Sequence, residues 1–168
     1  ITSLVESSAI SPSQVELEIT ESAGVEHLGK AIAVLTRLRL KGFGLSIDDY
    51  GTGFSSMQQL ARLPFSELKI DRSFVHGAHQ RRNLGVILES ALDMAKRLEL
   101  VSVAEGIETM EDWRLLQRCG CAVGQGYLIA RPMPAQDTPA WLRSHRARLP
   151  ELRLPPSPAL APALTPLD

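Results

Sequence analysis

The sequence predicts an α/β fold in which parallel strands alternate with helices. Short β-rich runs alternate with longer segments whose apolar residues recur at helical spacing. The composition, 44% hydrophobic and 22% charged over 168 residues, is typical of a globular domain. Strands that alternate with helices pair in parallel through right-handed crossovers. A closed barrel of eight such units typically needs about 250 residues, so the chain's five units form either a flat doubly wound sheet or part of a barrel.

Five runs rich in β-branched and apolar residues are the predicted strands. They are VELEIT (15–20), FGLSID (43–48), ELKID (67–71), VSVAE (101–105) and a last run around AVGQGYLI (122–129). Residues 1–9 are interpreted as the end of a preceding helix, and Ser11-Pro12 as its exit turn.

Apolar residues at helical spacing predict the helices between these strands. One stripe runs over residues 28–38 and another over residues 84–98. Thr109, with Asp112 three residues later, is typical of a capping box at the start of a third helix, which ends at Gly120. A last helix opens at Asp137 or Thr138 with Pro139 at its first position.

The composition changes near the carboxyl end of the chain. Six of the eleven prolines fall within residues 150–166, where they prevent regular packing. We therefore predict one folded domain over residues 1–149 and a flexible, proline-rich tail over residues 150–168.

Charge and hydropathy exclude several classes of function. A formal net charge of −1 argues against binding of nucleic-acid polymers, which needs a concentrated basic surface. The uncharged run 154–167 is broken by prolines, so direct membrane insertion is not expected. Cys119 and Cys121 are too few for a disulfide framework, which favours a reducing cytoplasm. The chain does not begin with methionine, which indicates a piece of a longer protein.

Polar side chains that could bind a cation or a substrate occur at or just after the end of every predicted strand. In a parallel sheet these ends lie on one side, where active sites are built. The residues are Glu18, Glu21, Asp48, Asp49, Lys69, Asp71, Glu105, Glu108 and Gln125. Any one of these acids alone is more often a cap or a turn former. Several acids at one rim raise one another's pKa values unless cations intervene, and oxygen ligands favour Mg²⁺ or Mn²⁺ over zinc.

These stretches resemble the EAL domain, a cyclic-di-GMP phosphodiesterase built on a TIM-like barrel. The resemblance covers roughly residues 10–145 and rests on ELEITES (16–22), IDDYGTGFSS (47–56), LPFSELKIDRSFV (63–75), VAEGIET (103–109) and GQGYLIARPMP (124–134). The Glu-Ala-Leu tripeptide that names the family does not occur, and the single asparagine, Asn83, falls at a helix start. The resemblance therefore implies an incomplete TIM-like (β/α) barrel, with about five of eight units and the first strands missing.

The resemblance also implies roles for individual residues. Metal ligands would be Glu18, Asp48 and Asp71, with Asp49 and Glu105 also serving the metal–water centre, and Lys69 would lie near the attacking water and the phosphate. Supporting positions would be Glu21, Gly51, Gly53, Glu108 and Gln125, with Arg131 as a candidate substrate contact. Two Mg²⁺ or Mn²⁺ ions would activate a bridging water for hydrolysis of cyclic-di-GMP to linear pGpG.

Three classes of function remain open from the sequence. The first is a phosphodiesterase, with an upstream regulatory domain and a homodimer as implied partners, whose isolated fragment would be weakly active or inactive. The second is a degenerate domain that binds cyclic-di-GMP without cleaving it. The third is an interaction module that uses an exposed sheet edge and the helix carrying Trp141. Retention of Lys69, Asp71 and Glu105 favours the enzyme.

Overall fold

The computed structural model describes residues 1–20, 28–51 and 62–152. The chain divides into two compact units, Ile1–Arg131 and Pro132–Asp168. In the second unit, the short helix η3 (Ala135–Asp137) leads into α7 (Thr138–Leu152), where the rings of Trp141 and His145 stack with their centroids 4.6 Å apart.

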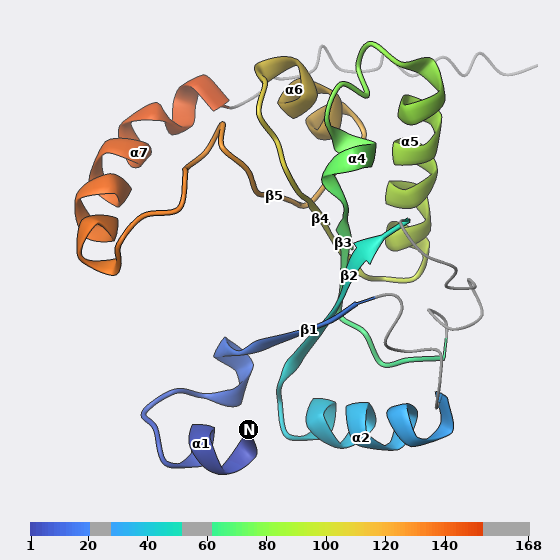
Figure 1. Cartoon of the computed structure of the whole chain (residues 1–168), viewed down its shortest axis with the longest axis vertical. Helices are drawn as coiled ribbons and strands as arrows, with labels where there is room; N and C mark the ends of the chain where they lie inside the picture. Colours follow the sequence, from blue (N-terminus) through green and yellow to red (C-terminus); the bar gives the residue numbers. More distant parts are fainter. Residues whose placement is uncertain (21–27, 52–61, 153–168) are drawn as a thin grey trace, which may run out of the picture. The chain divides into compact units, whose positions relative to one another are not determined.

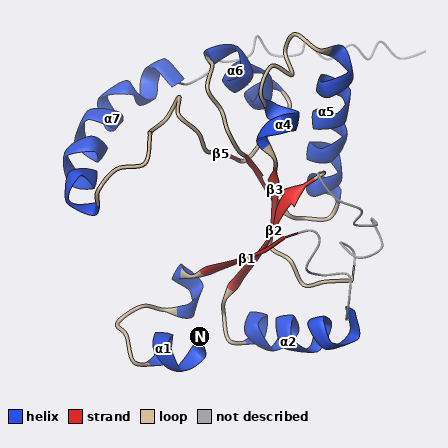
Figure 2. Ribbon diagram, in the orientation of Figure 1, coloured by secondary structure: helices blue, strands red, loops and turns tan. Residues whose placement is uncertain are grey.

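The first unit is built on a five-stranded parallel sheet (Figures 1 and 2). Its strands, in sheet order, are β1 (Glu16–Thr20), β2 (Gly44–Tyr50), β3 (Glu67–Ile70), β4 (Val101–Ala104) and β5 (Val123–Gly124). Every strand pairs in parallel with its neighbour in sequence. A doubly wound sheet reverses its strand order near the middle, whereas a barrel wall does not. The α/β prediction is therefore confirmed, and the strand order is that of an incomplete barrel rather than a flat doubly wound sheet.

In the first unit, helices lie before and between these strands (Figure 1). They are α1 (Thr2–Glu6), η1 (Pro12–Gln14), α2 (Leu28–Leu40), α4 (Arg72–Val75), α5 (Arg82–Arg97) and α6 (Met110–Arg118). The short helix α4 directly follows β3 and is not among the predicted helices. Within the three described stretches, the helices are too short or too polar to cross a bilayer.

Side chains that alternate along the strands define two faces of the sheet. The helix-covered face carries two hydrophobic clusters. Leu45, Ile47 and Leu68 are buried in one hydrophobic cluster, together with Ala95 of α5. Ile70 and Ala104 belong to a second cluster, with Leu88 and Leu92 of α5 and Leu116 of α6. Because successive strand residues point to opposite faces, the residues between these apolar positions face away from the helices. This alternation places the side chains of Asp48 and Lys69 on the inner face of the barrel wall.

The last predicted strand is wrong in length. The prediction ran over residues 122–129, but β5 contains only Val123–Gly124. Beyond Gly124 the backbone bonds to the loop after β4 instead: Ile107 N–H donates to the Gln125 carbonyl at 3.1 Å, and Leu128 N–H donates to the Ile107 carbonyl at 3.0 Å. A Cβ at Gly126 would collide with the Ile107 backbone, so this approach requires glycine.

Two other predicted boundaries also shift. Strand β2 extends to Tyr50, two residues past the predicted end, through a register irregularity between Ile47 and Tyr50. Helix α7 continues to Leu152, so position 150 is helical and the predicted tail boundary at 149/150 falls inside the helix. The remainder of the tail, residues 153–168, lies outside the described residues.

Candidate active site

A buried lysine is the centre of the polar cluster at the strand ends. Lys69, on β3, is 6% exposed. Its Nζ lies 2.8 Å from Glu18 Oε1 of β1, 2.9 Å from Asp48 Oδ1 of β2 and 2.8 Å from Glu105 Oε1, directly after β4. The structure therefore brings four of the predicted site residues together from four successive strand ends.

The surrounding carboxylates keep the Lys69 side chain charged. Burial disfavours the ammonium, but hydrogen bonds to Glu105, Glu18 and Asp48 outweigh this effect and raise the pKa of Lys69 above its ordinary value. An ammonium held in this way is a fixed positive charge and hydrogen-bond donor at neutral pH. Lys69 is thus suited to contact a phosphate or a water molecule and unsuited to act as a general base.

The adjacent acids Asp48 and Asp49 both reach the same site. One carboxylate oxygen from each, and one from Glu105, all lie within 4.8 Å of one another. Neighbours on a regular strand point to opposite faces. Here Asp49 has φ 56°, at the irregularity that follows Ile47 in β2, and such a bulge redirects a side chain. The two carboxylates lie close together through a bulge within the strand and not through the strand end, and their role as metal ligands stays a prediction.

This arrangement fits a hard divalent cation. Three carboxylate oxygens within 4.8 Å of one another are the ligand type that Mg²⁺ and Mn²⁺ prefer. With Glu18 included, the rim holds four carboxylates, three of which pair with the single ammonium of Lys69. The uncompensated negative charge favours binding of further positive charge.

Asp71 occupies a different position at the same rim. Its carboxylate accepts a hydrogen bond from Ser73 N–H at 2.9 Å and caps the short helix α4. Burial raises the pKa of Asp71, but hydrogen bonds from Ser73 and Arg72 and the Arg72 charge outweigh burial and lower it overall. Asp71 lies outside the group of three acids within 4.8 Å, so its assignment as a metal ligand stays a prediction.

The loop after β4 is fixed by an arginine that sequence reasoning missed. Arg72 Nη2 lies 2.8 Å from Glu108 Oε1. Gly106 has φ 65°, and a Cβ there would collide with the Arg72 side chain, so the arginine's stem lies directly on the loop. The signal was present in the sequence, because Arg72 directly follows Asp71. Gln125, the predicted supporting residue, contributes its backbone: its N–H donates to the Ala104 carbonyl at 2.8 Å.

A hollow of about 270 Å³ adjoins this loop. It is lined by Arg72, Glu105, Gly106, Glu108, Gln125, Gly126 and Tyr127. The ring of Tyr127 is largely exposed, and the guanidinium carbon of Arg131 lies 4.7 Å from its centroid. The predicted substrate contact, Arg131, therefore stacks on a residue of this hollow.

Of the predicted loop residues, Gly51 is described. It has φ 102°, and a Cβ there would lie 2.6 Å from the Phe74 ring, so the turn after Tyr50 requires glycine. Glu21 and Gly53 lie outside the described residues.

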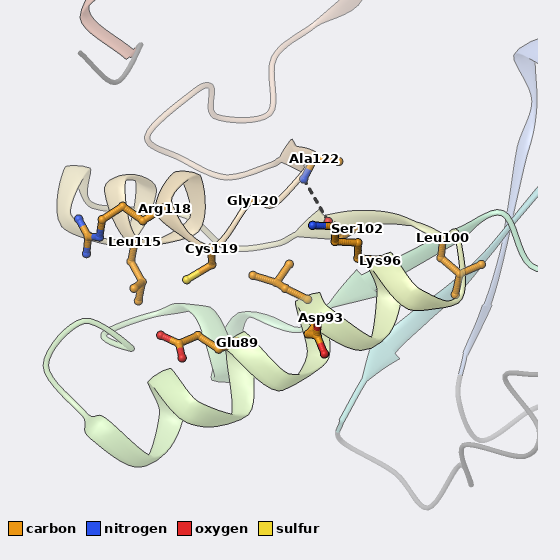
Figure 3. A pocket seen from close by; sticks show the side chains of 11 residues that line it. Glu89, Asp93, Lys96, Leu100, Ser102, Leu115, Arg118, Cys119, Gly120 and Ala122 are labelled. Atoms are coloured by element: carbon orange, nitrogen blue, oxygen red, sulfur yellow. Dashed lines mark hydrogen bonds between the residues drawn. The ribbon is translucent and has the colours of Figure 1, made fainter. Parts of the chain in front are cut away.

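A larger hollow of about 560 Å³ lies between α5 and α6, on the helix-covered side of the sheet (Figure 3). Glu89 and Asp93 of α5 lie across it from Leu115, Arg118 and Cys119. Burial, with a smaller contribution from Glu89, raises the pKa of the Cys119 thiol, which makes the thiol less reactive. This hollow lacks the convergent acids of the strand ends, so the rim around Lys69 is the candidate active site.

Fold and site together define a class of protein: an α/β-barrel protein whose strand-end carboxylates suit divalent cations. A comparison with known families then identifies the family, because the profile of the EAL domain matches residues 1–132. The chain belongs to the EAL domain family.

Known relatives agree with this assignment. The chain is 42% identical over 131 residues to the oxygen sensor protein DosP of Escherichia coli, a match that covers 78% of the chain and 16% of DosP. It superimposes on the PaMucR phosphodiesterase in its cyclic-di-GMP complex with a TM-score of 0.78 at 39% identity, covering 82% of this chain and 56% of the other. A manganese and cyclic-di-GMP complex of Klebsiella pneumoniae BlrP1 gives a TM-score of 0.69 at 35% identity, covering 73% and 31%. The chain therefore spans only part of each of these relatives.

Proposed function

We propose that this chain provides the metal-binding rim of a cyclic-di-GMP phosphodiesterase that hydrolyses one phosphodiester bond to give linear pGpG. The observation that supports this most directly is the packing of Lys69 against carboxylates from three other strand ends, beside the close trio Asp48, Asp49 and Glu105. The similarity to the cyclic-di-GMP complex of PaMucR supports the choice of substrate.

The trio Asp48, Asp49 and Glu105 would hold Mg²⁺ or Mn²⁺, with Glu18 and Asp71 as further ligands of a two-ion site. When bound, such ions polarise a phosphoryl oxygen and lower the pKa of a coordinated water. The manganese complex of BlrP1 supports the choice of metal.

Lys69 would contribute charge and position. Its pKa is raised, so the ammonium stays protonated, and its charge would stabilise a non-bridging phosphate oxygen, where negative charge builds up during hydrolysis. The three carboxylates that hold Nζ leave it little rotational freedom, and a charge fixed in advance stabilises a transition state most effectively.

The hollow beside Glu105 would take part of the nucleotide. The exposed Tyr127 ring, with Arg131 stacked on it, offers an aromatic surface on which a purine base could stack. Arg72 and Glu108, which also line this hollow, pair with each other and fix its wall.

We further propose that the 168-residue chain alone is weakly active or inactive. Within the described sheet, β1 pairs only with β2, so its other edge offers unpaired backbone groups. Cytoplasmic location and a homodimer are further parts of the proposal. An attached regulatory domain is also proposed, and it is supported by the relative DosP, which is named as an oxygen sensor.

The test is chromatography of cyclic-di-GMP incubated with Mn²⁺ and either this chain or a longer native polypeptide that contains it. We expect pGpG from the longer polypeptide and little from the chain alone, with Lys69→Met abolishing product in both. Intact cyclic-di-GMP that remains tightly bound to the longer polypeptide would instead identify a receptor. If the longer polypeptide neither forms pGpG nor retains bound cyclic-di-GMP, the proposed substrate is contradicted.

A further inference from the structure

Asp112 is a fully buried acid that takes no part in the Lys69 cluster. It lies in the first turn of α6 and is 1% exposed. Burial of a carboxylate is unfavourable unless hydrogen bonds satisfy its oxygens. The bonds that Asp112 accepts therefore show what the fold gains from an acid at this position.

The Asp112 carboxylate joins two segments that are far apart in sequence. Its Oδ1 accepts from Gly77 N–H at 3.1 Å and lies 2.7 Å from Nδ1 of His79. Because a carboxylate only accepts, Nδ1 of His79 is the donor. The other oxygen, Oδ2, accepts from the Thr109 hydroxyl at 2.8 Å, and Thr109 in turn caps α6 by accepting from Asp112 N–H at 3.1 Å.

Both joined segments lead directly to the rim. Gly77 and His79 follow α4, the helix that Asp71 caps, and Thr109 ends the loop that begins at Glu105. The Arg72–Glu108 pair links the same two segments at the rim itself, at 2.8 Å. The two links therefore join α4, at its start and just after its end, to the carboxyl end of the 105–109 loop and the first turn of α6.

On its other side, the 105–109 loop is bonded to the turn after β5. Ile107 is fully buried, and its N–H donates to the Gln125 carbonyl at 3.1 Å. The start of the loop is fixed as well, because Glu105 N–H donates to the Ile70 carbonyl at 3.1 Å, next to Lys69. With the start and this side fixed by backbone, the position of residues 106–109 depends on how α6 and α4 are joined. Asp112 contributes two hydrogen bonds to that join, from Gly77 and His79.

We infer that Asp112 is a positioning residue for the rim: through His79, Gly77 and Thr109 it holds the loop that follows Glu105, and that bears Glu108, against α4. The inference rests on the proposed function of the rim. Outer residues that orient metal ligands typically affect metal affinity or activity by about 10–100-fold, so we expect about a tenfold effect when the Asp112 carboxylate is removed.

The experiment compares Asp112→Ala, Asp112→Asn and His79→Ala with Glu111→Gln, a control on an exposed acid in the same turn. Hydrogen exchange of the 105–109 amides and Mn²⁺ titration are measured on the chain, well below each variant's Tm. Hydrolysis of cyclic-di-GMP is measured on a longer native polypeptide with the same substitutions. Asp112→Asn and His79→Ala each keep part of the network, so they serve if Asp112→Ala does not fold.

For Asp112→Ala we expect exchange of the 105–109 amides to quicken about tenfold, Mn²⁺ to bind about tenfold more weakly, and kcat to fall more than KM changes. Asp112→Asn and His79→Ala give smaller changes of the same sign, and Glu111→Gln gives none. A lower Tm with native loop exchange and native Mn²⁺ affinity would overturn the inference, because Asp112 would then be structural only. If the native polypeptide fails to hydrolyse cyclic-di-GMP, the proposed function fails, while loop exchange and Mn²⁺ affinity still decide the role of Asp112.

Discussion

Two buried ionic centres in the described part of the first unit are built in opposite ways. At one, the ammonium of Lys69 is surrounded by carboxylates of Glu18, Asp48 and Glu105. At the other, the carboxylate of Asp112 is surrounded by hydrogen-bond donors. Both side chains are almost completely buried, at 6% and 1% exposure.

The difference lies in how completely each charge is compensated. The Asp112 carboxylate receives donors on both oxygens from a backbone amide, a ring and a hydroxyl, so the centre is satisfied within the chain. Around Lys69, one ammonium faces several carboxylates, and Asp49 adds another nearby. A cluster with surplus negative charge favours binding of a further cation. A carboxylate whose oxygens are all hydrogen-bonded instead holds the segments around it rigidly in place. We therefore assign chemistry to the Lys69 centre and positioning to the Asp112 centre.

Lys69→Met tests the comparison with the largest expected effect. Without the ammonium, three carboxylates face one another, and breaking such buried pairs destabilises proteins by about 3 kcal/mol. Loss of the fixed positive charge that we propose faces the phosphate should lower kcat by about 100-fold or more. Thermal unfolding with and without Mn²⁺, and hydrolysis by a longer native polypeptide, measure both effects. The exposed Lys96→Met is the control, and equal behaviour of the two variants would contradict the role of Lys69.

Asp48→Asn examines the surplus charge directly. Fewer charged ligands weaken binding of a hard cation, so we expect Mn²⁺ affinity to fall by at least about tenfold. Calorimetric titration of Mn²⁺ is the measurement, with Asp93→Asn on α5 as a matched acid away from the rim. Unchanged affinity in Asp48→Asn would remove Asp48 from the metal site.

Gly51→Ala and Gly77→Ala compare one glycine beside each centre. Both have positive φ, 102° and 74°, so alanine is strained by roughly 1 kcal/mol at either position. At Gly51 the new Cβ would also lie 2.6 Å from the Phe74 ring, whereas nothing lies within 4 Å at Gly77. Chemical denaturation should show the larger loss of stability for Gly51→Ala. A larger loss for Gly77→Ala would contradict the close approach of the Phe74 ring to Gly51.

Glu67→Gln gives the smallest expected effect and probes the inner face beneath Lys69. Burial, and then the neighbouring Glu16, raise the pKa of Glu67 above its ordinary value. A carboxyl whose pKa is raised in the folded state binds its proton more tightly in the folded protein. Its negative charge therefore destabilises the fold at pH values above the raised pKa. This destabilisation disappears below the pKa of the unfolded state. Glu67→Gln should thus stabilise the chain at pH 7 by no more than about 0.5 kcal/mol. The gain should vanish near pH 4, and a loss of stability at pH 7 would contradict this account.

Much of the fold followed from periodic patterns in the sequence. Alternation of strands with helices predicted the parallel sheet, and the Thr109–Asp112 spacing predicted the start of α6. The short β5 could not be predicted, because Gly126 permits a backbone contact with Ile107 that no local pattern records. The bulge at Asp49 was not predicted, because in the sequence a strand that contains one irregular residue cannot be distinguished from a strand that ends there.

The site was predictable as a set of residues but not as a network. Strand ends in a parallel sheet meet at one rim, so Glu18, Asp48, Lys69 and Glu105 could be grouped from their spacing. Partners from helices and loops were not accessible in this way. Arg72 and His79 lie outside the strands, and only the folded chain brings them to Glu108 and Asp112.

The central claim is that carboxylates from neighbouring strand ends hold a divalent cation beside a fixed lysine. Crystals of the protein grown with Mn²⁺, measured at the manganese absorption edge, test it most directly. We predict an anomalous peak within bonding distance of carboxylate oxygens of Asp48, Asp49 and Glu105, with the Lys69 ammonium nearby. Well-ordered density for these side chains with no anomalous peak among them would contradict the claim.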